Sequence, residues 1–140
     1  MKATASRKAI GAVLLTATMV LSMTAFAQSK DDHLKVNIPF DFYVGARQMP
    51  AGTYIVEAST NGTAKMSNND THESMVFVTT PIIKKNRQAD PRLVFNSYGD
   101  AHFLSQVWWG APVDGLRSIP SKQEREIARV NTPVRLTVIR

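Results

Sequence analysis

The fold class is decided by one stretch of the chain, Leu34-Lys35-Val36-Asn37-Ile38-Pro39-Phe40-Asp41-Phe42-Tyr43-Val44. Apolar side chains occupy every second position of these eleven residues. This period of two predicts a β-strand with one buried face. Pro39 has no backbone N–H to donate to a neighbouring strand, so it predicts either a place at a sheet edge or a break into two shorter strands.

Further strands are expected at 53–59, 63–67, 73–80, 92–98, 101–109 and 134–138. The strand at 73–80 is an apolar run, which predicts burial, and Pro81 is expected to end it. Residues 110–120 contain two glycines and two prolines and are expected to form a loop.

The first hairpin can be assigned its loop length from the faces of its strands. A two-residue loop at Asn61-Gly62 would place apolar residues opposite polar ones. A three-residue loop at 60–62 places Val56 opposite Met66 and Ala58 opposite Ala64, which keeps one apolar face. It also puts Gly62 at the left-handed position that such loops require, so we prefer it.

A single short helix is expected near the C-terminus. Ser121 and Glu124 have the spacing of a capping box, which starts a helix that continues to about Val130. Only Ile127, Ala128 and Val130 are apolar enough to pack, so this helix should cover the sheet. Together these patterns predict an all-β fold, a small antiparallel sandwich or partly open barrel of about seven strands with one short C-terminal helix.

The first 27 residues have the layout of a cleavable secretory signal peptide. Lys2, Arg7 and Lys8 precede an uncharged apolar segment, which closes on Ala25-Phe26-Ala27. Four Ser and Thr residues interrupt that segment, which argues against an uncleaved membrane anchor, and the absence of cysteine excludes a lipoprotein. We therefore expect a single β domain at 28–140, located outside the cytoplasm, either in the periplasm or released.

Cleavage would change the charge balance of the protein. The signal segment carries three of the 17 basic residues and none of the 11 acidic ones, so 14 basic residues would face 11 acidic ones and the net charge would fall from +6 to +3. This modest charge does not point to nucleic acid. No stable membrane span is expected after cleavage, and no cofactor is expected.

The residues that usually carry catalysis or bind metals form no recognisable constellation. There is no cysteine and no G-x-S-x-G motif. His72-Glu73 begins like H-E-x-x-H, but Val76 stands at the fifth position and the segment has strand character. His33 follows two aspartates in a polar tail, and His102 is expected opposite Ser97 in a hairpin. We predict no catalytic residue, no metal ligand and no enzyme.

The hairpin at 92–109, built around Gly99-Asp100, has two apolar faces. One face is expected to carry Leu93, Phe95, Leu104 and Trp108, and the other Val94, Tyr98, Phe103, Val107 and Trp109. The second face needs a cover from the helix, from the 110–120 segment or from outside. If the cover comes from outside, the candidate ligand or partner face consists of Tyr98, Phe103, Trp108 and Trp109, and of the two adjacent tryptophans at most one can belong to it.

Basic side chains gather in two segments. They are Lys84, Lys85 and Arg87 in one connection, and Arg125, Arg129, Arg135 and Arg140 near the C-terminus. Ordinary solvated surface is the favoured interpretation, and a patch for anionic envelope polymer or lipid head groups is the alternative.

Three segments carry a resemblance to a known family: Val36–Phe42, Met49–Tyr54, and Arg92–Ser105 with its R-L-V-F, Y-G-D and F-L-S runs. Across most of 28–140 the chain resembles a family of small signal-peptide-bearing exported proteins of unassigned function, common in soil bacteria. The resemblance implies a bacterial exported β domain and transfers no catalytic or binding residue. We expect a non-enzymatic binding or envelope-associated module; the alternatives are a small β-barrel carrier of an apolar ligand, self-association and, least favoured, a hydrolase.

Overall fold

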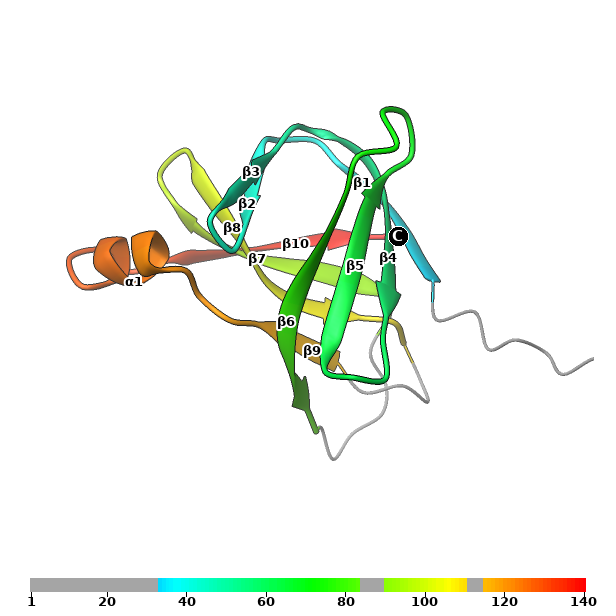
Figure 1. Ribbon diagram of the computed structural model, residues 1–140. Helices are drawn as coiled ribbons and strands as arrows, with labels where there is room; N and C mark the ends of the chain where they lie inside the picture. Colours follow the sequence, from blue (N-terminus) through cyan, green and yellow to red (C-terminus); the bar gives the residue numbers. More distant parts are fainter. Residues whose placement is uncertain (1–32, 84–89, 111–114) are drawn as a thin grey trace, which may run out of the picture.

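The computed structural model describes residues 33–83, 90–110 and 115–140, and these form ten β-strands and one helix (Figure 1). The elements are β1 (His33–Ile38), β2 (Phe42–Val44), β3 (Arg47–Met49), β4 (Gly52–Ala58), β5 (Thr63–Asn68), β6 (Ser74–Ile82), β7 (Arg92–Tyr98), β8 (Ala101–Trp108), β9 (Gly115–Ser118), α1 (Lys122–Ala128) and β10 (Val134–Ile139). The all-β class is confirmed. The expected signal segment and the Lys84, Lys85 and Arg87 connection lie outside the described residues.

The strands form one curved mixed sheet. Backbone pairing follows the order β1-β4-β5-β6-β9-β8, and β7 and β10 continue the sheet beyond β8. β2 joins β8 through a single parallel bridge from Tyr43 to Phe103, and β3 pairs with β2. β10 comes back into contact with β1 (Figure 1), and no backbone pairing joins these two described strands. The sheet is therefore a partly open barrel.

The interruption predicted at Pro39 is confirmed. β1 ends at Ile38 and β2 begins at Phe42, so the alternating stretch forms two strands. The apolar residues of both strands point into the barrel, where Ile38 and Phe42 are fully buried. The carboxylate of Asp41 accepts a 2.8 Å hydrogen bond from the backbone N–H of Ala51, which ties this corner to the start of β4. This division and the short strands β3 and β9 raise the strand number above the expected seven.

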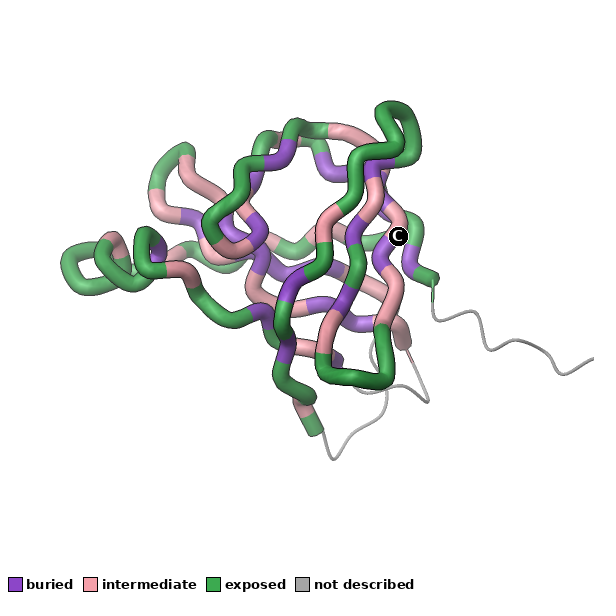
Figure 2. The backbone as a smooth tube through the Cα atoms, viewed as in Figure 1, coloured by how far each residue is buried: buried purple, intermediate pink, exposed green. Residues whose placement is uncertain are grey.

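Aromatic side chains fill the middle of the barrel. The ring of Phe42 makes edge-to-face contacts with Tyr54, at 5.1 Å, and with Phe95, at 5.5 Å. Phe40 contacts Phe95 in the same way at 5.1 Å. Buried residues occupy every second position of β1 and β5 (Figure 2), as strands with one buried face require. The core thus joins β2, β4 and β7, which are distant in the sequence.

The hairpin of β4 and β5 has the predicted register. Val56 is paired with Met66 and Ala58 with Ala64, and Gly62 has a φ of 78°. A left-handed residue at this position lets a three-residue loop reverse the chain. The cross-strand pattern of apolar residues was therefore sufficient to fix this register.

The prediction for β6 was wrong in two respects. The strand is buried on one face only: Val76 and Val78 are 63% and 58% exposed, while Phe77 is buried. It also continues through Pro81 to Ile82, because it leaves β5 after residue 78 and pairs with β9 from residue 79. A strand tolerates proline where the missing N–H is not part of its ladder.

The expected loop at 110–120 is also corrected. Its residues 115–118 form β9, which lies between β6 and β8 and pairs with both. Turn-forming residues predicted a loop here, but two neighbouring strand edges supply pairing partners that local sequence cannot reveal. β9 closes this side of the barrel and positions the site described below.

Candidate functional site

The hairpin of β7 and β8 contains a β-bulge at Ser105. The turn at Gly99-Asp100 and the pairing of Phe95 with Leu104 agree with the prediction. Beyond that pair, Val94 lies opposite Gln106, so Ser105 is an extra residue in β8. Because side chains alternate along a strand, one extra residue moves every following side chain to the opposite face.

Because of the bulge, Val107, Trp108 and Trp109 lie on the opposite faces of the hairpin from those expected. Val107 is fully buried in the barrel core, and Trp109 packs against that core. Trp108 lies on the other face, with its Cα paired to that of Arg92. The indole N–H of Trp109 donates a 3.3 Å hydrogen bond to the carbonyl of Val56 in β4, so this tryptophan reaches across the barrel.

The four candidate residues therefore do not share one face. Tyr98, Phe103 and Trp108 lie on the outer face of the hairpin, opposite Trp109. Phe103 and Trp108 are only 1% and 4% exposed, and Tyr98 is half-buried.

The cover of this outer face comes from the chain itself. Tyr43 of β2 stacks on Phe103 with ring centroids 4.9 Å apart. At the other end, Gly115 of β9 lies so close to Trp108 that a β-carbon at position 115 would stand 2.6 Å from the indole ring. Arg92 places its guanidinium 5.4 Å from the centre of the same ring. Strands β2 and β9 thus supply the cover, and each contacts an aromatic residue of β8.

Helix α1 is held against the barrel by a glutamate. Ser121 caps the helix, as predicted, by accepting a 3.1 Å hydrogen bond from the N–H of Glu124. The carboxylate of Glu124 accepts a 3.1 Å hydrogen bond from the amide of Asn96 in β7, and the residue as a whole is 5% exposed. Val130, which was expected to pack, is 82% exposed instead. Of the other two residues expected to pack, Ala128 is exposed and Ile127 is half-buried, so the polar contact of Glu124 adds to the little apolar packing that this helix has.

Burial changes the acidity of Glu124. Removal from water raises the pKa of its carboxyl above the usual value, and the hydrogen bond from Asn96 opposes part of this increase. Burial also raises the pKa of the Tyr98 hydroxyl, and the nearby charge of Glu124 adds to that effect. Glu124 is thus a partly desolvated carboxyl on the outer face of the hairpin.

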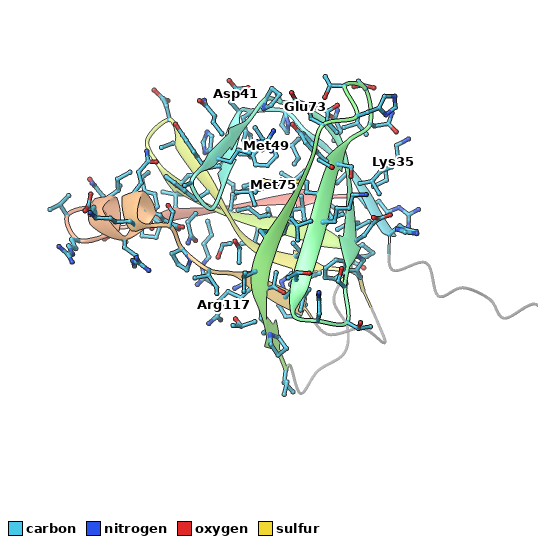
Figure 3. All side chains as sticks on the ribbon, viewed as in Figure 1. Lys35, Asp41, Met49, Glu73, Met75 and Arg117 are labelled. Atoms are coloured by element: carbon cyan, nitrogen blue, oxygen red, sulfur yellow. The ribbon has the colours of Figure 1, made fainter. Side chains whose placement is uncertain are left out.

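An open pocket of about 260 Å³ lies beside Glu124, and we call it the α1 pocket. Its lining comes from β7, β8, β9, β10 and the α1 segment and is mostly polar: Asn96, Leu104, Ser105, Gln106, Arg117, Ser118, Pro120, Glu124 and Arg135. Arg135 is paired with Asn96 across β10 and β7, which brings it to this face. Arg117 extends from β9 on the outside of the barrel (Figure 3).

The two arginines give the α1 pocket a positive charge. Among the residues that the structure describes, no carboxylate forms an ion pair with Arg117 or Arg135. Of the C-terminal basic residues named above, Arg125, Arg129 and Arg140 are exposed and do not line this pocket. Two guanidinium groups and one buried carboxyl can bind an anion that also carries hydrogen-bond donors.

Ser97 and His102 pair as expected across the β7–β8 hairpin. The hydroxyl of Ser97 lies 2.6 Å from Nδ1 of His102, whose ring stands 4.4 Å from that of Phe40. Ser97 is 5% exposed, and no carboxylate of the described residues bonds to His102. A nucleophile needs access to its substrate, so we assign this pair a structural role.

The other histidines do not form a metal site in the described residues. His33 lies 3.0 Å from the carboxylate of Glu57, and Asp31 and Asp32 fall outside the described range. His72 precedes a strand, in a left-handed conformation with φ of 60°. Within residues 33–83, 90–110 and 115–140, no cluster of three metal-binding side chains occurs.

Sequence reasoning missed most of the α1 pocket. It identified Glu124 as a capping residue and Arg135 as a surface charge, and it gave no role to Asn96, Gln106 or Arg117. The capping-box spacing singled out Glu124, but it predicts a carboxylate that bonds the backbone N–H of Ser121, whereas the structure shows this carboxylate bonded to Asn96.

Comparisons with known proteins add no assignment. Among the described residues, no helix has the length and apolar character needed to cross a membrane. No match to the chain was found among protein-family models, among curated proteins or among solved structures.

Proposed function

We propose that this protein is an exported, non-enzymatic binding module that holds a small anion, or the anionic group of an envelope polymer, in the α1 pocket. The observation that carries the proposal is the pair of arginines, Arg117 and Arg135, which line one polar pocket without an ion-pair partner in the described residues. A guanidinium group binds carboxylate and phosphate through paired N–H donors.

The signal-peptide layout of residues 1–27 supports the exported location. The lack of a nucleophile with an accessible base supports a binding role for the described part of the chain, since Ser97 is buried beside His102. A pocket that is open to solvent also suits a polymer, because one residue of the polymer can enter while its neighbours stay outside.

The carrier of an apolar ligand has less support. Such a protein needs an apolar cavity inside the barrel. The ring of Phe42 contacts those of Tyr54 and Phe95 in the middle of this barrel, and all three residues are fully buried. The outer aromatic residues Phe103 and Trp108 are likewise covered by the chain itself.

Calorimetric titration of the mature protein with acetate, inorganic phosphate and glucuronate at low salt tests the proposal. We expect at least one of these anions to bind. Each of Arg117→Gln and Arg135→Gln should weaken that binding by about threefold to tenfold, because each removes one charged donor. Added salt should weaken it as well, since the arginines are exposed to solvent.

Arg129→Gln is the matched control, because Arg129 is an exposed arginine that does not line the α1 pocket. Its affinities should equal those of the wild type. Absence of binding for all three anions, or an equal loss in Arg129→Gln and Arg135→Gln, would refute the proposal.

A further inference from the structure

We infer that the ligand of the α1 pocket is a sugar acid, whose carboxylate binds Arg117 and Arg135 and whose hydroxyl groups donate to Glu124. This inference rests on the proposed function and names the class of ligand. It depends on the fact that one small pocket is lined both by two cationic side chains and by a buried carboxyl group.

Glu124 supplies a hydrogen-bond acceptor. One of its carboxylate oxygens accepts a hydrogen bond from Asn96, and among the described residues no cation forms an ion pair with it. A ligand hydroxyl that donates to this carboxyl forms a charge-assisted bond, and Glu124 itself is 5% exposed. Burial raises the pKa of Glu124, and the same burial strengthens such a bond.

The anionic and cationic groups of the pocket are separated. No ion pair joins Glu124 to Arg117 or to Arg135, although all three line the same pocket. A ligand that carries its negative charge at one end and its donors at the other can satisfy both groups. A sugar acid has this arrangement, with a carboxylate on one ring carbon and hydroxyl groups on the others.

The remaining polar lining suits hydroxyl groups. It consists of amide and hydroxyl side chains: Asn96, Ser105, Gln106 and Ser118. The amide oxygen of Gln106 accepts a 3.0 Å hydrogen bond from the indole N–H of Trp108. That bond directs the amide nitrogen of Gln106 to other partners, so this side chain can donate to a ligand oxygen.

The size and charge of the pocket disfavour other anions. Its volume of about 260 Å³ lies below the 300–1,000 Å³ range of pockets for drug-sized ligands, which fits a single sugar ring. Sulfate presents only charged acceptor oxygens, so one of them would face Glu124 and be repelled, and hydrogen phosphate offers fewer O–H donors than a sugar acid does. An apolar carboxylate would leave the buried carboxyl without a donor.

A comparison of three probes of similar size tests the inference. Glucuronate carries both the carboxylate and the hydroxyl groups, cyclohexanecarboxylate has only the carboxylate, and glucose has only the hydroxyl groups. We expect glucuronate to bind the mature protein at least about tenfold more tightly than either of the other probes, because each of them loses one set of charged hydrogen bonds.

Glu124→Gln supplies the second measurement. Glutamine keeps an oxygen for the Asn96 bond and loses the negative charge, so the fold should persist, and circular dichroism checks this. We expect glucuronate to bind this variant about tenfold more weakly. Cyclohexanecarboxylate should bind Glu124→Gln at least as tightly as it binds the wild type, because the variant no longer repels an anion.

The outcomes separate the inference from the function on which it rests. If cyclohexanecarboxylate or phosphate binds as tightly as glucuronate, or if Glu124→Gln weakens glucuronate and cyclohexanecarboxylate equally, the inference is overturned while the anion-binding function stands. If no anion binds, the proposed function itself fails.

Discussion

The amide of Asn96 in β7 donates a 3.1 Å hydrogen bond to the carboxylate of Glu124 in α1, and this contact joins residues 28 positions apart. It docks a helix that has little apolar surface. It also holds a buried carboxyl at the edge of a pocket that contains two arginines. One hydrogen bond therefore serves both the fold and the candidate site.

Replacement of Glu124 by glutamine should change how stability depends on pH. Burial raises the pKa of Glu124 in the folded protein, so between the unfolded and folded pKa values the folded state binds more protons than the unfolded chain. The free energy of unfolding of the wild type should therefore fall as the pH rises through this window. Glu124→Gln does not titrate there, so its stability relative to the wild type should increase from about pH 4 upward and then level off.

Urea unfolding at a series of pH values measures this difference. Glu126→Gln is the control, because Glu126 is an exposed carboxylate on the same helix. Parallel stability curves for Glu124→Gln and the wild type would contradict the prediction.

Gly115→Ala should destabilise the protein by about 1–3 kcal/mol, the usual cost of an overpacked site. The new β-carbon would stand 2.6 Å from the indole ring of Trp108, which would have to move. Denaturant unfolding gives the stability, and a shift of the tryptophan fluorescence reports the displaced ring.

Gly45→Ala is a useful comparison for that variant. Gly45 has a φ of 60° and no neighbour within 4 Å of a β-carbon, so alanine there costs backbone strain alone. We expect unchanged tryptophan fluorescence in Gly45→Ala. Unchanged stability and fluorescence in Gly115→Ala would show that β9 does not pack on Trp108.

Asn68→Ala should cost about 1–3 kcal/mol, because it removes the buried side-chain acceptor of two backbone hydrogen bonds in this turn. The side-chain oxygen of Asn68 accepts hydrogen bonds from the N–H groups of Asp70, at 2.8 Å, and Thr71, at 3.0 Å. Asn69→Ala removes the exposed neighbouring amide and should change stability by less than about 0.5 kcal/mol. Equal thermal shifts in the two variants would rule out this role for Asn68.

Phe95→Ala should lower the free energy of unfolding by about 3–5 kcal/mol, the typical loss for a buried aromatic ring. Its ring is fully buried and contacts both Phe40 and Phe42. Val76→Ala shortens a side chain that is 63% exposed and should be nearly neutral. Chemical denaturation compares the two, and a small effect for Phe95→Ala would mean that the barrel interior is not tightly packed.

Local patterns in the sequence determined much of this fold. The alternation from Leu34 to Val44 predicted strands with a buried face, and cross-strand matching gave the register of Val56 opposite Met66. The capping-box spacing placed the start of the helix at Ser121. Each of these features depends on residues close together in the chain, whose side-chain period or turn chemistry is visible without a partner.

Only the tertiary structure decided which side chains lie on each face of the β7–β8 hairpin and which residues line the α1 pocket. With the bulge at Ser105, Val107 is paired with Leu93 of β7 on one side and with Leu116 of β9 on the other. Trp108 and Trp109 then lie on the opposite faces of the hairpin from those expected. β9 forms because β6 and β8 offer it two edges. The carboxylate of Glu124 bonds the amide of Asn96, and the pairing of β10 with β7 places Arg135 next to Asn96 at the same pocket. These contacts form between distant segments, so their free energy depends on the folded arrangement and leaves no local pattern in the sequence.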